Sequence, residues 1–261
     1  MTVQQILEYV NSLAPVHMKA DWDNVGLLCG RRDQEVKKIL VALDPFMDVC
    51  EEAAAVGADL IVTHHPLIFC APKTVTTDDS VGQCILYLAS RGISAVNAHT
   101  NLDCAPDGVN DVLARTLGLE QIQVLDPQGA DGQGRPWGLL RTGSVAETEL
   151  PAFLERVKAC LGTPVLRYTD GGKPVRRVAV GGGSCGDGLY DVLAAGCDTF
   201  VTADIKYNQF WDAADLGLNL IDAGHFYTEN PVCAALADRL RQQFPEVEVI
   251  LSKHSDCMKF F

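Results

Sequence analysis

Short apolar runs alternate with longer amphipathic segments along most of this chain. The apolar runs predict strands at 39–43, 60–63, 93–97, 137–142, 165–168, 175–180, 199–201, 218–221 and 247–251. Apolar residues at helical spacing predict helices at 47–56, 80–91, 111–117, 149–160, 189–195, 207–214 and 232–243. Thr2 and Gln5 have the spacing of a capping box, so a further helix is expected to follow Thr2. This alternation predicts an α/β fold with a largely buried sheet.

Two pairs of segments far apart in the chain resemble each other. Residues 97–103 read NAHTNLD and residues 222–229 read DAGHFYTE, and each run places a carboxylate four residues after an imidazole. Residues 57–65, GADLIVTHH, are matched by residues 196–204, GCDTFVTAD. We therefore predict two similar α/β lobes from an internal duplication, at residues 1–127 and 134–261. The polar, glycine-rich stretch 128–133 is the expected linker, and a metal site is expected in the cleft between the lobes.

Polar side chains that suit metal binding follow closely after several predicted strands. They are Asp44, His64, His65, His99, Asp103, Asp204, His225 and Glu229. Ligands of open α/β sheets bind beyond the carboxyl ends of the strands, so these side chains are expected to gather at one edge. A lone histidine on an apolar strand is usually a core residue. The adjacent pair His64–His65, with two His-x-x-x-acid runs elsewhere, favours metal binding instead.

Two metal ions suit this set better than one, because adjacent histidines at a strand end point in different directions. Asp103 and Glu229 offer oxygen ligands and His225 a nitrogen ligand. Two close divalent ions repel unless a carboxylate or hydroxide bridges them, and Glu229 is the bridging candidate. His99 is expected either to be a ligand or to orient one. Zinc, iron, manganese, cobalt and nickel all accept such ligands. His17 and His254 have no comparable neighbours and are interpreted as structural or surface residues.

A glycine-rich run at 181–186 follows a predicted strand and matches the pattern G-x-G-x-x-G. Three interpretations remain open: a dinucleotide-binding loop, a structural turn, or a loop whose N–H groups, including those of Gly182 and Gly183, face an anionic substrate. The dinucleotide reading is the weakest, because the acidic residue expected about 20 positions on is Asp204, beside the candidate metal site. Lys206 either meets a phosphate or is solvated at the start of a helix.

Composition excludes several classes of protein. The net charge of −13 over 261 residues argues against a nucleic-acid binder, because such binding rests on Lys and Arg side chains that neutralise phosphates. No apolar run approaches the roughly 20 residues of a membrane span. The first residues have neither the basic start nor the continuous apolar core of a signal peptide. Ten scattered cysteines without C-x-x-C spacing are expected to be small buried hydrophobes in the cytoplasm.

Five segments resemble the NIF3-like dinuclear-metal family, the GTP cyclohydrolase 1 type 2 homologues. They are residues 21–28 (DWDNVGLL), 62–69 (VTHHPLIF), 97–103 (NAHTNLD), 201–206 (VTADIK) and 222–229 (DAGHFYTE). The resemblance implies a two-lobed α/β fold, a toroidal homohexamer and a dinuclear site carried by His64, His65, Asp103, His225 and Glu229. It implies supporting roles for Trp22, Asp23 and Asn24.

The first functional hypothesis is a metal-dependent hydrolase that uses a metal-activated water on a nucleotide-like or phosphorylated small molecule. Lys206, Gly182 and Gly183 are candidates for holding its phosphates, and Asp204 or His99 for moving protons. The alternative is a non-enzymatic metal-binding ring that acts as a scaffold or recruits a partner. An oxidoreductase that uses a nicotinamide cofactor rests only on the glycine loop.

Overall fold

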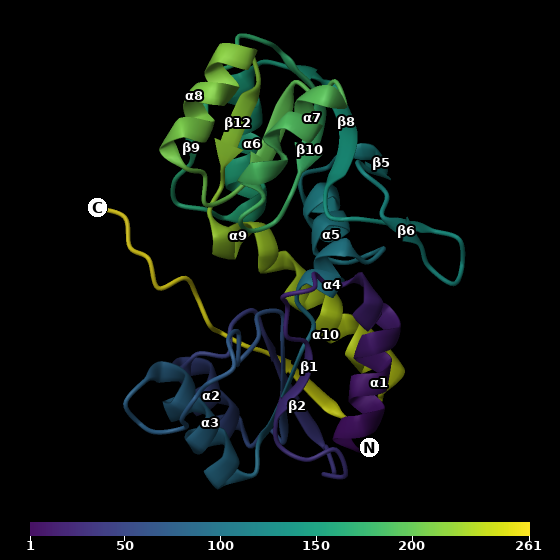
Figure 1. The fold of residues 1–261 in the computed structure, drawn as a ribbon, viewed down its shortest axis with the longest axis vertical. Coiled ribbons are helices and arrows are strands. Elements are labelled where there is room, and N and C mark those ends of the chain that lie inside the picture. Colours follow the sequence, from purple (N-terminus) through teal and green to yellow (C-terminus); the bar gives the residue numbers. More distant parts are fainter. The chain divides into compact units, whose positions relative to one another are not determined.

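The computed structural model describes residues 1–261, which form two compact units (Figure 1). Unit 1 contains Met1–Leu102 and Cys233–Ser255, and unit 2 contains Asp103–Val232 and Asp256–Phe261. The expected linker at 128–133 lies inside unit 2, where β6 (Gly129–Ala130) and β7 (Pro136–Trp137) form a small hairpin. The boundaries at 127 and 134 therefore need correction.

Strand pairing explains why the units do not follow the two halves of the sequence. The last strand, β13 (Glu248–Leu251), pairs in parallel with β2 (Lys38–Ala42) and so belongs to the sheet of unit 1. In the other direction, β5 (Glu120–Val124) pairs with β8 (Arg141–Thr148) in unit 2. Each sheet thus takes in a strand that the sequence halves would assign to the other lobe.

Unit 1 is built on a five-stranded sheet with the order β1-β4-β3-β2-β13. β2, β3 (Leu60–Thr63) and β4 (Ser94–Asn97) run parallel to one another, and β1 (Gly26–Cys29) pairs antiparallel with β4. Ala42, Thr63 and Asn97 are level in the sheet. The residues that follow these three therefore leave the sheet at one edge, as expected for parallel strands.

Helices cover both faces of the unit 1 sheet. On one face, α2 (Met47–Val56) and α3 (Ser80–Arg91) pack against Leu40, Ile61 and Ala95 through Val49, Ala53 and Leu88. On the other side lie α1 (Val3–Leu13) and α10 (Pro231–Gln243) (Figure 1). The expected capping box at Thr2 and Gln5 is present at the start of α1. A short 3-10 turn, Val16–Met18, follows this helix.

Unit 2 has a six-stranded sheet with the order β5-β8-β10-β11-β12-β9. β10 (Val175–Val180), β11 (Thr199–Thr202) and β12 (Asn219–Asp222) are parallel. β8 and β9 (Arg167–Thr169) pair antiparallel with the outer two of these strands. Three adjacent parallel strands in chain order thus form the centre of this sheet, as β2, β3 and β4 do in unit 1.

Alternate residues of the central strands supply two separate cores in unit 2. Val178 and Val180 of β10 pack with α5 (Val109–Thr116) and α6 (Leu150–Leu161), whereas Ala179 packs with α7 (Leu189–Ala194) and α8 (Tyr207–Leu216). Successive side chains of a strand point to opposite faces, so a strand covered on both faces is apolar throughout. This explains the unbroken apolar run at the end of β10.

The predicted α/β class is confirmed, with differences in detail. The strand expected at 137–142 is divided between β7 and β8, and the short helices α4 (Thr100–Cys104) and α9 (His225–Glu229) were not expected. None of the helices combines the length and the apolar character that crossing a membrane would require. All ten cysteines are free and six are buried, which agrees with a role as small apolar side chains.

Candidate metal centre

Three imidazoles come together at the carboxyl edge of the unit 1 sheet. His64 and His65 follow β3, and His99 follows β4 after Ala98. Their ring centroids are 4.9 to 5.5 Å apart, and one nitrogen from each ring lies within 4.8 Å of the others. We call His64, His65 and His99 the imidazole cluster. The register of β3 and β4 produces it, because Thr63 and Asn97 are level in the sheet.

Each ring of the imidazole cluster has its Nδ1 atom next to an acceptor. Nδ1 of His64 is 3.0 Å from the carbonyl oxygen of Ala98, Nδ1 of His65 is 2.6 Å from Oδ1 of Asp44, and Nδ1 of His99 is 2.8 Å from Oδ1 of Asp23. A carbonyl or carboxylate oxygen only accepts, so Nδ1 carries the proton in all three rings. Histidines that bind metals are oriented in this way, with Nε2 as the ligand atom.

The two aspartates that hold these rings remain ionised over a wide pH range. Burial alone would raise the pKa of Asp23, but hydrogen bonds from His99 and Thr100 outweigh burial and hold it well below its usual value. Burial would likewise raise the pKa of Asp44, but hydrogen bonds from His254 and His65 outweigh burial and lower it. A lasting negative charge at Nδ1 makes an imidazole a better electron donor at Nε2.

A second group of candidate ligands lies in unit 2, and we call Asp103, His225 and Glu229 the α9 cluster. His225 and Glu229 begin and end α9, and a spacing of four residues places both on one face of the helix. Nε2 of His225 is 3.0 Å from Oε2 of Glu229, and Nδ1 is 2.7 Å from Oδ2 of Asp204. A carboxylate oxygen of Asp103, from α4, lies within 4.8 Å of one from Glu229. Glu229 and Asp103 are both buried.

His225 is held between two carboxylates. Burial opposes its positive charge, but the hydrogen bonds with Asp204 and Glu229 outweigh burial and raise the pKa of His225 to about 10. The bond from His225 in turn lowers the pKa of Asp204, against a smaller effect of burial. Asp204 adopts a left-handed backbone conformation with φ of +53°. The structure thus places Asp204 as the partner of Nδ1, and its expected part in proton transfer stays a prediction.

We expect metal binding at His225 to release a proton, because a ligand imidazole must be neutral. With the pKa raised to about 10, affinity should rise about tenfold per pH unit from neutral pH upward and level off above pH 10. Without metal, the ion pairs of His225 stabilise the fold fully below pH 6.5 and lose this contribution as the pH rises through 10.

Zinc titrations at about pH 7.5 and about pH 8.5, in buffers of different ionisation enthalpy, measure this release. His225→Asn serves as the variant without the titrating group, and its affinity should depend less on pH. An affinity that is equal at both pH values in the unaltered protein would contradict the expected proton release.

The N–H groups of Gly182 and Gly183 are occupied within unit 2. The amide of Gly182 donates to Oδ1 of Asn110 at 2.6 Å, and that of Gly183 donates to the Thr228 hydroxyl at 3.0 Å. The hypothesis that these groups face an anionic substrate therefore needs correction. A Cβ atom at Gly183 would lie 2.1 Å from Oε1 of Glu229. The glycines instead leave room for the candidate ligands of α9.

Lys206, the other candidate for phosphate binding, is exposed at the start of α8. Its Nζ atom lies 3.7 Å from Oδ1 of Asp187, and both side chains are mostly solvent-accessible. A pair so exposed contributes little to stability, at most about 1 kcal/mol. The ammonium group is therefore accessible to an anion, and its role stays a prediction.

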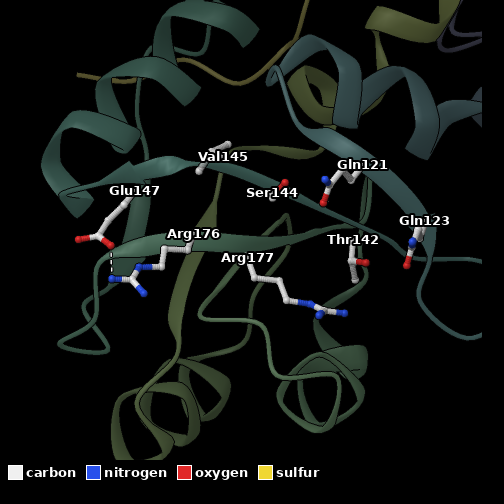
Figure 2. A pocket seen from close by; sticks show the side chains of 9 residues that line it. Gln121, Gln123, Thr142, Ser144, Val145, Glu147, Arg176 and Arg177 are labelled. Carbon is white, nitrogen blue, oxygen red and sulfur yellow. Dashed lines mark ion pairs between the residues drawn. The ribbon is translucent and has the colours of Figure 1, made fainter.

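A hollow of about 560 Å³ lies over β5, β8 and β10 of unit 2 (Figure 2). Polar side chains line it, among them Gln121, Gln123, Arg176 and Arg177. Arg176 pairs with Glu147. None of the candidate metal ligands lines this hollow, so it is distinct from the α9 cluster of the same unit.

Sequence reasoning missed two features beside the imidazole cluster. Trp22 and Phe69 are 63% and 55% exposed, and their rings lie 6.1 and 6.2 Å from the ring of His99. His254, expected to be structural or at the surface, is hydrogen-bonded to Asp44 and Asp48. No local pattern reveals this contact, because more than 200 residues separate His254 from each aspartate.

A comparison with known protein families identifies the family to which this chain belongs. The model of the Duf34/NIF3 (NGG1p interacting factor 3) family matches residues 1–257. The chain belongs to the Duf34/NIF3 family. A relative from Clostridium perfringens, named GTP cyclohydrolase 1 type 2 homolog, is 36% identical over 260 residues, which cover 98% of this chain and 97% of the relative.

Solved structures of this family agree with the fold. A Bacillus cereus protein described as related to NIF3 has a TM-score of 0.94 and 26% identity, covering 100% of this chain and 99% of the other. A hypothetical protein from Staphylococcus aureus has a TM-score of 0.93 and 28% identity with the same coverage. The resemblance first seen in five short segments is thus confirmed over the whole chain.

The residues present fit metal ions. In the imidazole cluster Nδ1 is protonated in every ring, so the Nε2 atoms hold the lone pairs that a first-row divalent ion requires. The α9 cluster provides two buried carboxylates and an imidazole, and carboxylates neutralise the charge of bound ions. The structure thus contains groups of His, Asp and Glu side chains that could hold metal ions, whose number and identity it leaves open.

Proposed function

We propose that this chain is a metal-dependent hydrolase with a dinuclear centre. The observation that carries the proposal is the common orientation of the three imidazoles, each fixed through Nδ1 by an oxygen acceptor. A histidine that is buried only for packing needs a hydrogen bond at one ring nitrogen. Nothing then requires its other nitrogen to lie close to the nitrogens of neighbouring histidines. Converging imidazoles favour a positive ion beside them, for which His64 and His65 are the proposed ligands and His99 a neighbouring base.

The proposed ligands are His64, His65, Asp103, His225 and Glu229. Unit 1 offers imidazoles, and unit 2 offers two carboxylates with one imidazole. Two divalent ions need both kinds of donor, because carboxylates offset their repulsion. In this set Glu229 is the proposed bridging group. Zinc, iron, manganese, cobalt and nickel all suit such donors.

When bound, two divalent ions supply Lewis acidity, which activates water and polarises the bond to be hydrolysed. The proton of the attacking water needs an acceptor, and His99 is the proposed one. Its Nδ1 proton is shared with Asp23, whose ionised carboxylate stabilises the imidazolium that forms when Nε2 takes a proton. Asp204 plays the corresponding orienting part for His225.

A planar, nucleotide-like substrate is supported by the exposed pair Trp22 and Phe69. Their ring centroids are 5.6 Å apart, and the pair borders His99. Asn24 donates a hydrogen bond of 2.6 Å to the carbonyl oxygen of Ile68, which ties the two ring-bearing segments together. Exposed aromatic rings suit stacking with a base, which contributes about 1–3 kcal/mol. Lys206 is the proposed phosphate contact.

Metal content decides the first part of the proposal. Protein purified without chelators or an affinity tag is expected to contain about two first-row metal ions per chain by plasma mass spectrometry. His65→Ala and Glu229→Gln should lose most of this metal. Little metal in the unaltered protein, even after reloading, would contradict the proposed centre.

Turnover decides the second part. The loaded protein is to be tested on GTP, other nucleotides and simple phosphoesters. Trp22→Ala is the matched control, because it should keep its metal and raise KM for nucleotides more than for phosphoesters without a base. Full metal content without turnover on any substrate would favour the alternative, a non-enzymatic metal-binding ring. The homohexamer implied by the resemblance and the cytoplasmic location expected from the sequence remain part of the proposal, and light scattering tests the oligomeric state.

A further inference from the structure

The segment after β13 is anchored on α2 of unit 1. The N–H group of Ser252 continues the parallel pairing by donating to the carbonyl oxygen of Val41 at 2.8 Å. Glu52 of α2 then accepts from the Ser252 hydroxyl and, at 3.0 Å, from the N–H group of Lys253. These contacts fix where the next residue, His254, is placed.

His254 bridges two carboxylates. Its Nε2 atom is 3.2 Å from Oδ2 of Asp44, and its Nδ1 atom is 2.5 Å from Oδ2 of Asp48. Only 8% of the side chain is exposed, and its ring lies 6.4 Å from that of Phe46. Ionised carboxylates only accept hydrogen bonds, so both nitrogens of His254 donate and the ring is an imidazolium.

Asp44 joins this imidazolium to the imidazole cluster. One of its oxygens accepts from His254, and the other accepts from Nδ1 of His65 at 2.6 Å. Asp44 is 9% exposed, so water has little access to replace either contact. The carboxylate is therefore held at both oxygens, and its plane is fixed by two rings that come from distant parts of the chain.

We propose that His254 is a positioning residue that sets the tautomer and orientation of His65 through Asp44. This inference rests on the proposed function in one respect, namely that His65 is a metal ligand. Without His254, the Asp44 carboxylate is free to rotate about its Cβ–Cγ bond. His65 then loses the fixed acceptor that keeps the proton on Nδ1 and the lone pair on Nε2.

Zinc affinity is the first test, measured by competition with a chromophoric chelator. His254→Ala is expected to weaken the binding of zinc about tenfold, since outer partners of metal-bound histidines typically contribute 10–100-fold. His254→Gln, which keeps one N–H donor toward Asp44, should recover part of the loss. Glu52→Gln is the matched control, because the amide oxygen of glutamine can still accept from the N–H group of Lys253, so the position of His254 and the contacts of Asp44 should be kept.

A double-mutant cycle shows whether the effect passes through Asp44. In an Asp44→Ala background, His254→Ala should change zinc affinity no further, because residues in one hydrogen-bond network are not additive. If the two changes add, His254 acts by another route and the proposal is overturned. A purely structural role would lower the melting temperature of His254→Ala and leave the zinc affinity of the folded protein unchanged.

The imidazole nitrogen resonances of the metal-free protein give a readout that needs no metal. His65 should show the Nδ1–H tautomer in the unaltered protein and a mixture of tautomers in His254→Ala. Unchanged tautomers, with zinc affinities within about twofold, would overturn the proposal while leaving the metal centre intact. Absence of zinc binding in the unaltered protein would instead refute the proposed function, and the tautomer shift would still decide the role of His254.

Discussion

Replacing Arg141 with methionine is expected to lower the free energy of unfolding by about 3–5 kcal/mol, the usual cost of breaking a buried ion pair. The Arg141 side chain is 1% exposed, and its Nε atom donates to Oδ1 of Asp111 at 2.7 Å. Its other nitrogens donate to the carbonyl oxygens of Gly138, Cys104 and Ala105. Methionine fills the volume of the aliphatic part of the Arg141 side chain but leaves Asp111 and the three carbonyl oxygens without these donors.

Urea denaturation measures this change, and Arg176→Met is the matched control. Arg176 pairs with Glu147 at the surface, with both side chains more than half exposed, so its loss should cost at most about 1 kcal/mol. Equal effects of the two substitutions would contradict the argument. The turn held by Arg141 directly follows Asp103, so Arg141→Met is also expected to weaken metal binding.

Replacing Gly183 with alanine is expected to lower the free energy of unfolding by about 2–4 kcal/mol and to displace a candidate ligand. Gly183 has a φ of +63°, which strains any residue with a side chain, and its Cβ would lie 2.1 Å from Oε1 of Glu229 and 2.9 Å from Nε2 of His225. One of these two side chains has to move. Metal content should fall together with stability.

Gly196→Ala separates backbone strain from crowding. Gly196 has a φ of +72°, but a Cβ there would meet nothing within 4 Å. We expect this variant to lose only about 1–2 kcal/mol from backbone strain and to keep its metal. A Gly183→Ala protein that is no less stable than Gly196→Ala, with normal metal content, would refute the proposed role of Gly183 as space for Glu229.

Local patterns predicted most of the fold, because most of its elements are set by local rules. The helix at 47–56 and the strand at 175–180 have the predicted bounds, since apolar periodicity and turn residues mark both. β5 was missed because it is partly exposed and lacks a continuous apolar run, and β1 was missed because it is only four residues long. The unit boundary was missed because it depends on the pairing of β13 with β2, which no short segment encodes.

The candidate site was likewise predicted where local sequence determines it and missed where tertiary contacts determine it. Strand ends drew attention to His64, His65 and His99, and the structure brings them together because β3 and β4 are parallel and in register. The sequence motif at 181–186 suggested a phosphate loop, but the amides of Gly182 and Gly183 are taken by Asn110 and Thr228. Those acceptors come from α5 and α9, so only the tertiary structure reveals the contact.

The place of β13 in unit 1 also constrains the order in which a nascent chain can fold. All the strands of the unit 2 sheet lie between Glu120 and Asp222, so that sheet is complete once this stretch has left the ribosome. The sheet of unit 1 begins earlier yet is completed later, because β2 has no partner on one side until Glu248–Leu251 has been made. Until then the apolar residues Ile39, Leu40 and Val41 form an open strand edge, the kind of surface that invites aggregation. Molecular chaperones that bind exposed strands would therefore act on β2 in the interval after the unit 2 sheet has been made and before residues 248–251 have emerged.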